Sequence, residues 1–162
     1  RRYTFQMTIL EAIETEVGNL STKTRFIYAG NLEEANATIF DTIKEGDFPV
    51  CLVLAFDITD EGRANGRVIS SAEINTLFLH KVPNQGSIDS VTAQVESSII
   101  APMRALTREL VNRLDLNDII EEEGISELVN RNTYEALMDA HLYGNWGVFN
   151  IRFSEDLTTC AP

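Results

Sequence analysis

Two cysteines and two histidines are the side chains that could support nucleophilic catalysis. A Cys or Ser nucleophile needs a His base within hydrogen-bonding reach, and a carboxylate usually orients that base. His80 and His141 both fall in segments predicted as strands, where a histidine on a strand face is the common role. Cys51 lies in the apolar run FPVCLVLAF, which disfavours a reactive thiolate, and Cys160 lies near the chain end. We therefore predict no enzyme activity, and a hydrolase or transferase using Cys51 or His80 is the least favoured alternative.

Two groups of acidic residues have the types of side chain that bind cations. From Asp57 to Val68 the sequence superficially resembles a calcium loop, but Val68 stands at the twelfth position, where a bidentate Glu is required. The run from Glu121 to Glu123 could chelate a divalent ion, although a solvated surface is the commoner role of such a run. The sequence has no CxxC pair, no His/Cys cluster and no glycine-rich phosphate loop. We predict neither a metal site nor a cofactor.

Length and charge limit the class of protein. A chain of 162 residues that is 44% apolar fits a single domain over residues 1–162. No apolar run reaches the roughly 18 residues of a membrane-spanning helix, and the first ten residues lack the pattern of a signal peptide. A net charge of −12 argues against a surface that grips DNA, because phosphate binding needs clustered Lys and Arg. We expect a soluble protein that can lie close to DNA without binding it.

Hydrophobic periodicity predicts the elements of the N-terminal half. Residues 4–17 carry apolar side chains three and four positions apart, which is typical of a helix, and residues 25–29, RFIYA, are typical of a strand. Asn31 can cap a second helix, with Glu34 in a capping-box-like position. Residues 48–56, FPVCLVLAF, are almost continuously apolar, which indicates a central strand covered on both faces.

A long hairpin is predicted next. Residues 57–67, DITDEGRANGR, are polar and rich in turn residues, so we expect them to form its protruding, mobile tip. Residues 68–82 form its second strand, with Ile74 and Phe78 on the side opposite Leu77 and Leu79.

The C-terminal half is predicted to hold the longest helix and a last pair of strands. Apolar residues from Val91 to Leu114 recur at helical spacing, and Pro102 should kink or split this helix near Ala101. Residues 114–129 suggest a short helix or a meander, and the last strands are expected at 132–141 and 148–153. The order of elements predicts an α+β fold, with helices packed on one face of a mostly antiparallel sheet.

The segment GNWG, residues 144–147, has two interpretations: Gly144 and Asn145 form a hairpin turn, or the glycines form a bulge in one continuous strand. Beyond it, alternation places Phe149, Ile151 and Phe153 on a core face. The opposite face mixes aromatic, aliphatic and arginine side chains, a composition typical of interfaces. The predicted subunit or partner contacts on this face and on the 68–82 strand are Trp146, Val148, Arg152, Ile74 and Phe78.

The kinked strand followed by GVFNIRFSEDLTTC near the chain end resembles small structural proteins of tailed bacteriophages, in particular tail terminator, tail-completion and neck proteins. The placement of FPVCLVLAF and of the hairpin after it is similar to that in tail terminators. This resemblance implies a small sheet flanked by helices and a homomeric ring, commonly hexameric or a multiple of six, at the head-to-tail junction of the virion. It also implies assembly in the host cytoplasm, neighbours among portal, connector or tail-tube proteins, and DNA that passes through without specific binding.

The acidic composition fits that implication, because a lumen lined by carboxylates repels DNA and lets it slide. The predicted lumen-facing or ring-facing residues are Asp57, Asp60, Glu61, Glu121, Glu122 and Glu123. The alternative is a non-catalytic acidic adaptor that binds a basic partner within a bacterial complex.

Overall fold

The computed structural model describes residues 8–64, 66–81, 93–137 and 142–155. It has a six-stranded sheet in the order β1-β2-β4-β6-β5, with β3 beside β4 beyond the end of β2. Only β1 and β2 pair in parallel, so the predicted α+β class with a mostly antiparallel sheet is confirmed. The strands are β1 (Arg25–Ala29), β2 (Val50–Leu54), β3 (Thr59–Ala64), β4 (Arg67–Lys81), β5 (Ile120–Leu137) and β6 (Leu142–Glu155).

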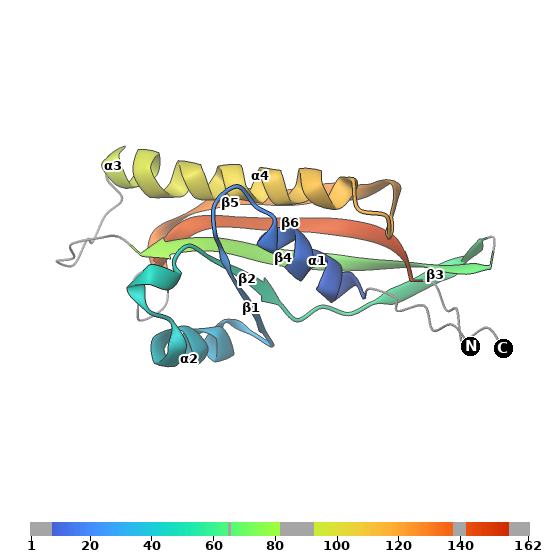
Figure 1. Ribbon diagram of the computed structural model, residues 1–162, viewed down its shortest axis with the longest axis horizontal. Helices are drawn as coiled ribbons and strands as arrows, with labels where there is room; N and C mark the ends of the chain where they lie inside the picture. Colours follow the sequence, from blue (N-terminus) through green and yellow to red (C-terminus); the bar gives the residue numbers. More distant parts are fainter. Residues whose placement is uncertain (1–7, 65, 82–92, 138–141, 156–162) are drawn as a thin grey trace.

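Helices lie on both faces of the sheet (Figure 1). The helices are α1 (Ile9–Gly18), α2 (Leu32–Thr42), the short α3 (Ala93–Val95) and α4 (Ala101–Asp115). We call the side covered by α1 and α4 the helix face. The opposite side, the open face, is covered by α2 over β1, β2 and the end of β4, so the prediction of helices on one face holds for α1 and α4 but not for α2.

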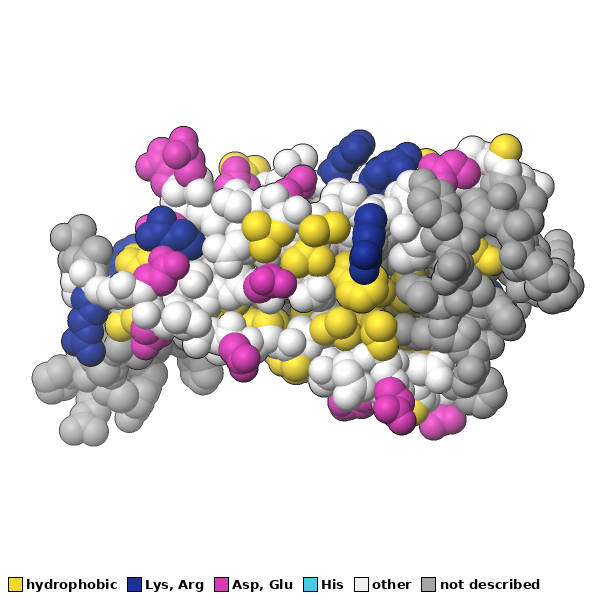
Figure 2. Space-filling model, turned by 180° about the vertical axis from the view of Figure 1, so that it is seen from behind, with side chains coloured by type: hydrophobic (Ala, Val, Ile, Leu, Met, Phe, Trp, Pro, Cys, Tyr) yellow, Lys and Arg dark blue, Asp and Glu magenta, His cyan; other side chains and the backbone are white. Residues whose placement is uncertain are grey.

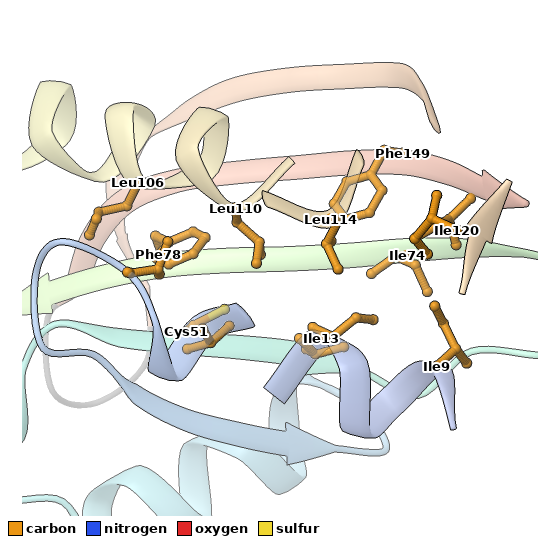
Figure 3. Packing of buried hydrophobic residues seen from close by; sticks show 14 of the residues in the cluster. Ile9, Ile13, Cys51, Ile74, Phe78, Leu106, Leu110, Leu114, Ile120 and Phe149 are labelled. Carbon is orange, nitrogen blue, oxygen red and sulfur yellow. The ribbon is translucent and has the colours of Figure 1, made fainter. Parts of the chain in front are cut away.

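The main core lies between α1, α4 and the helix face. Figure 3 shows Leu106, Leu110 and Leu114 of α4 pointing toward strand residues that include Phe78 and Phe149. A second cluster packs Ala35 and Ile39 of α2 against β1, β2 and the end of β4. The central strand β2 is therefore buried on both faces, as its continuous apolar sequence predicts.

Local capping explains where the first two helices begin. Thr8 Oγ1 accepts a hydrogen bond from Glu11 N, and Glu11 Oε2 accepts one from Thr8 N, which completes a capping box at the start of α1. Asn31 caps α2 as predicted, because its Oδ1 accepts from Glu34 N at 2.8 Å. The Glu34 carboxylate, however, accepts from Gly30 N rather than from Asn31 N, so the reciprocal half of the predicted box is shifted by one residue.

The hairpin differs from its prediction at the tip. Residues 59–64, expected in a mobile loop, form strand β3 and pair with the first part of β4. Gly66 adopts a φ of 78° beyond the end of β3, and the β3–β4 register shifts between Asp60 and Gly62. The apolar alternation that signals a strand is missing here because the described side chains of β3 are exposed.

The long helix is interrupted just before Pro102, as its sequence predicts. Residues Glu96–Ile100 form a π-helical segment, η2, between α3 and α4. Ala101 N donates to Glu96 O, five residues back, and Pro102 has no N–H to continue the ladder. The predicted apolar face is buried from Val95 to Leu114, whereas Val91 lies outside the described residues.

The last two strands are much longer than predicted. β5 begins at Ile120, inside the segment expected to be a helix or meander. Its pairing with β6 shifts register three times, and Glu123 has a positive φ of 55°. These irregularities break the alternation by which a strand is recognised in a sequence.

Candidate interaction surface

GNWG lies inside the continuous strand β6, as the second predicted interpretation has it. The predicted hairpin turn is wrong, and the pairing with β4 shows no bulge at the glycines. The β4–β6 pairing runs without a register shift from Lys81 opposite Leu142 to Val68 opposite Glu155. The glycines are explained by close packing. A Cβ at Gly144 would overlap the backbone carbonyl oxygen of Phe78 on β4.

The helix-face side of GNWG fastens α4 to the sheet. A Cβ at Gly147 would lie 2.7 Å from Thr107 Cγ2, so the glycine makes room for the helix. Thr107 Oγ1 donates to the buried Asn145 Oδ1 at 2.8 Å. Asn145 Nδ2 donates to the Arg131 backbone oxygen at 3.1 Å and to Asn132 Oδ1 at 3.2 Å. One buried amide thus connects α4, β5 and β6, and this half of the motif is structural.

The open-face side of GNWG carries Trp146, which has a fixed orientation. The indole Nε1 donates to Asn75 Oδ1 of β4 at 3.1 Å. The Arg131 guanidinium lies over the ring, with Cζ 4.7 Å from the centroid, a cation–π arrangement. Two polar partners from neighbouring strands therefore hold a half-buried indole in place.

Two valines extend this surface along the sheet. Val129 stands opposite Val148, and Arg131 stands opposite Trp146, so these four side chains form a block on adjacent strands. Val129 is 45% exposed, and Trp146 and Val148 are half-buried. We call these four residues the open patch. Figure 2 shows this side of the molecule, with hydrophobic side chains gathered near its middle and a basic side chain lying across them.

The predicted contact residues divide between the two faces. Trp146, Val148 and Arg152 lie on the open face, where the sequence places them. Arg152 Nε pairs with Glu61 Oε2 at 2.9 Å and so links β6 to β3. Ile74 and Phe78 are fully buried on the helix face, because they alternate in phase with the core residues of β4. Their predicted role as contact residues is therefore wrong.

The predicted acidic residues come together at one end of the sheet. Asp60 stands opposite Ser70, Ser70 opposite Phe153, and Phe153 opposite Ile120, which directly precedes the 121–123 run. Ser70 Oγ donates to Asp60 Oδ1 at 2.9 Å. Of the other five side chains, Glu121 is half-buried and the rest are exposed, namely Asp57, Glu61, Glu122 and Glu123.

Two leucines are exposed, and the sequence patterns did not predict this exposure. Leu116, just after α4, is 85% exposed, and Leu128 is 54% exposed at the β5 register shift between Glu127 and Val129. Leu116 falls outside the helical spacing of the buried face, which ends at Leu114. That break in the spacing is the one sequence signal that could have predicted an exposed leucine here.

The residues considered for catalysis occupy separate settings. Cys51 is fully buried in the core, and this burial raises the pKa of its thiol far above the ordinary value. His80 lines a cleft of about 350 Å³ beside Ser21 and Glu109, and its Nδ1 lies 2.7 Å from the Lys81 backbone oxygen. His141 and Cys160 lie outside the described residues. Absence of enzyme activity stays a prediction.

The Glu109 carboxylate in this cleft is already occupied. It accepts from Ser21 N at 2.8 Å and from Ser21 Oγ at 2.7 Å, and it pairs with Arg113. Desolvation raises the pKa of Glu109, but these hydrogen bonds and the Arg113 charge outweigh that effect and lower it. Its contacts fasten the segment after α1 to α4.

No protein-family model matches the sequence, and no curated protein matches it. Within the described ranges, no helix is long and apolar enough to cross a membrane. In the same part of the chain, no three His, Cys, Asp or Glu side chains converge as a metal site would require.

Proposed function

We propose that this protein is a structural assembly protein that forms a homomeric ring at the head-to-tail junction of a tailed-phage virion, as a tail terminator or neck component. The observation that carries the proposal is the open patch. Tryptophan and arginine are the residue types that most often dominate binding energy at protein interfaces. Here both are held in place by neighbouring strands, so docking a partner costs little side-chain entropy.

The fold supports the same proposal. A small sheet flanked by helices, with a long hairpin after the central strand, is the arrangement that the resemblance to tail terminators implies. The hairpin extends the sheet at one end through β3 (Figure 1). A sheet surface with a fixed apolar centre suits packing against a neighbouring subunit.

Charge supports the passage of DNA without binding. The chain carries a net charge of −12, and the exposed acidic residues of β3 and early β5 lie at one end of the sheet. In the proposed ring this end faces the lumen or a neighbouring ring. Carboxylates there repel the DNA backbone, whereas clustered Lys and Arg would bind it.

The exposed acidic side chains also favour the alternative, a non-catalytic adaptor that binds a basic partner. The two functions differ in self-association, because an adaptor needs no closed ring and stays monomeric or dimeric. Neither function requires a cofactor or a membrane.

A pair of matched variants tests the proposal. Val129, in the open patch, and Ile58, outside it, are exposed aliphatic residues at 45% and 47%. We expect Val129→Asp to reduce the assembled mass measured by light scattering, because a carboxylate in an apolar contact is strongly unfavourable. Ile58→Asp should assemble as the wild type does. Equal assembly of the two variants contradicts a role for the open patch.

A further inference from the structure

The most exposed large hydrophobic side chain among the described residues is Leu116, at 85%. It lies between Asp115 and Asp118, which are both exposed, and the acidic run of early β5 follows a few residues later. We call residues 115–118 the Leu116 turn. It presents an aliphatic side chain flanked by carboxylates, and docking this side chain on an apolar surface would remove its exposed area from water.

Backbone hydrogen bonds fix the shape of this turn. Leu116 N donates to Arg113 O at 3.2 Å, and Asn117 N donates to Leu114 O at 3.0 Å. Ile120 N then donates to Asn117 O at 3.0 Å, while Ile119 N bonds to Asn117 Oδ1 at 3.2 Å. The leucine is therefore held outward by an ordered turn.

The open patch has the complementary chemistry. It offers the apolar surfaces of Trp146, Val148 and Val129, and the positive charge of Arg131. Within the described part of the chain, Arg131 has no ion-pair partner, and neither have the two aspartates of the turn. An aliphatic group surrounded by carboxylates thus matches an apolar surface with an arginine on it.

The two surfaces of one chain are too far apart to meet. Ser154 N donates to Ile119 O at 2.9 Å, so the turn lies beside the end of β6. Val148 precedes Ser154 by six positions on that strand, which is about 20 Å at roughly 3.4 Å per residue. Any contact between these surfaces must therefore join two copies.

We propose that the Leu116 turn of one copy docks on the open patch of the next, with Leu116 packed against Trp146 and Val148 and the two aspartates close to Arg131. The occupant of the open patch is thus a second copy of this chain. The contact uses a different surface on each copy, and such head-to-tail contacts close rings or extend filaments. This assignment rests on the proposed homomeric assembly.

Cysteine cross-linking tests the contact directly. In a Cys160→Ser background, one chain carries Leu116→Cys and a second carries Val148→Cys, while the buried Cys51 stays in place. Mild oxidation should give a covalent dimer in the mixture but not with either chain alone. A chain with both cysteines should give a ladder of covalent oligomers. A Val148→Cys chain that cross-links to itself as readily as the mixture does would overturn the head-to-tail contact.

Charge exchange tests the electrostatic part. Arg131→Glu, and separately the double change Asp115→Arg with Asp118→Arg, should each weaken assembly. Combining all three in one chain should restore it. Leu116→Asp should weaken the association roughly tenfold to hundredfold, as expected for the loss of one buried leucine, and Ile58→Asp is the control. All of these residues are exposed, and circular dichroism checks that each variant folds.

The outcomes separate the two proposals. If the wild type assembles but Leu116→Asp assembles equally well, the contact assignment falls and the proposed ring stands. If the wild type stays monomeric at millimolar concentration and the mixture of Leu116→Cys and Val148→Cys chains forms no cross-link, the proposed function itself falls.

Discussion

The substitution Gly144→Ala tests whether the β4 backbone packs closely against the glycine in GNWG. The added Cβ would overlap the Phe78 carbonyl oxygen and come within 3.1 Å of Leu79 Cα. Both are backbone atoms of β4, so the clash cannot be relieved by turning a side chain. Either β4 and β6 separate locally, or the strands shift against α4.

The size of the effect follows from this geometry. Overpacking a close-packed site costs about 1–3 kcal/mol. Losing two ladder hydrogen bonds beside the clash adds about 0.5–1.5 kcal/mol each. We therefore expect Gly144→Ala to lower the free energy of unfolding by about 2–6 kcal/mol. At about 2–4 °C per kcal/mol for a chain of this size, Tm falls by roughly 5–20 °C.

The assay is urea and thermal unfolding followed by far-ultraviolet circular dichroism, since the only tryptophan is two residues from the change. Gly18→Ala is the matched control, because a Cβ at Gly18 has no atom within 4 Å. Alanine is also the better helix former there, so the control should be neutral or slightly stabilising. A Gly144→Ala protein within about 1 kcal/mol of the control would refute the close approach of β4 and β6, and would favour a solvent-facing turn.

Two further predictions concern buried groups. Asn145→Ala should lower the free energy of unfolding by about 2–4 kcal/mol in urea, because it leaves the Arg131 backbone oxygen and the buried Thr107 hydroxyl without their amide partner. Asn150→Ala, on the open face, should change the free energy of unfolding by less than about 1 kcal/mol, and equal losses would contradict the buried network. Burial raises the pKa of Cys51, so its thiol stays neutral in the folded protein, whereas in the unfolded chain it ionises above a pKa of about 8.5. The free energy of unfolding is therefore unaffected by this group below that pH and falls as pH rises above it. Unfolding curves between pH 7 and 10 should show this alkaline loss in the wild type and less of it in Cys51→Ala. In a Cys160→Ser background, a thiol reagent should label native Cys51 only as fast as the protein unfolds, and rapid labelling of that native protein would contradict its burial.

The elements predicted correctly from sequence are those whose buried sides carry regular apolar spacing. β2 is continuous in Val, Leu and Cys because it is covered on both faces. Apolar residues at every second position predict which residues share a side of β4. Apolar residues three to four positions apart predict the buried face of α4. In each case the buried residues lie at regular positions within one element, so the local spacing of apolar residues is enough to predict which side is buried.

The parts missed from sequence depend on distant partners. The exposed strand β3 shows no apolar alternation, and in β5 the register shifts interrupt the alternation. The glycines of GNWG are required by Phe78 and Thr107, which are remote in sequence, and a single chain pattern cannot distinguish such an approach from a turn.

The candidate site was foreseen only in part. Alternation along β6 placed Trp146 and Val148 on a common face away from the core. It could not reveal that Arg131 and Val129 join them, because the β5–β6 register sets those neighbours. Ile74 and Phe78 were misassigned because alternation separates the two sides of β4 but does not show that α1 and α4 cover the side of these two residues.

The solution mass of the unaltered protein tests the central claim most directly. Light scattering across concentration and salt, followed by negative-stain images, should show a closed homomeric ring of one size. Binding to double-stranded DNA should be negligible at physiological salt, because the exposed charge is mainly negative. A protein that remains monomeric or dimeric up to millimolar concentration contradicts the ring and favours the adaptor.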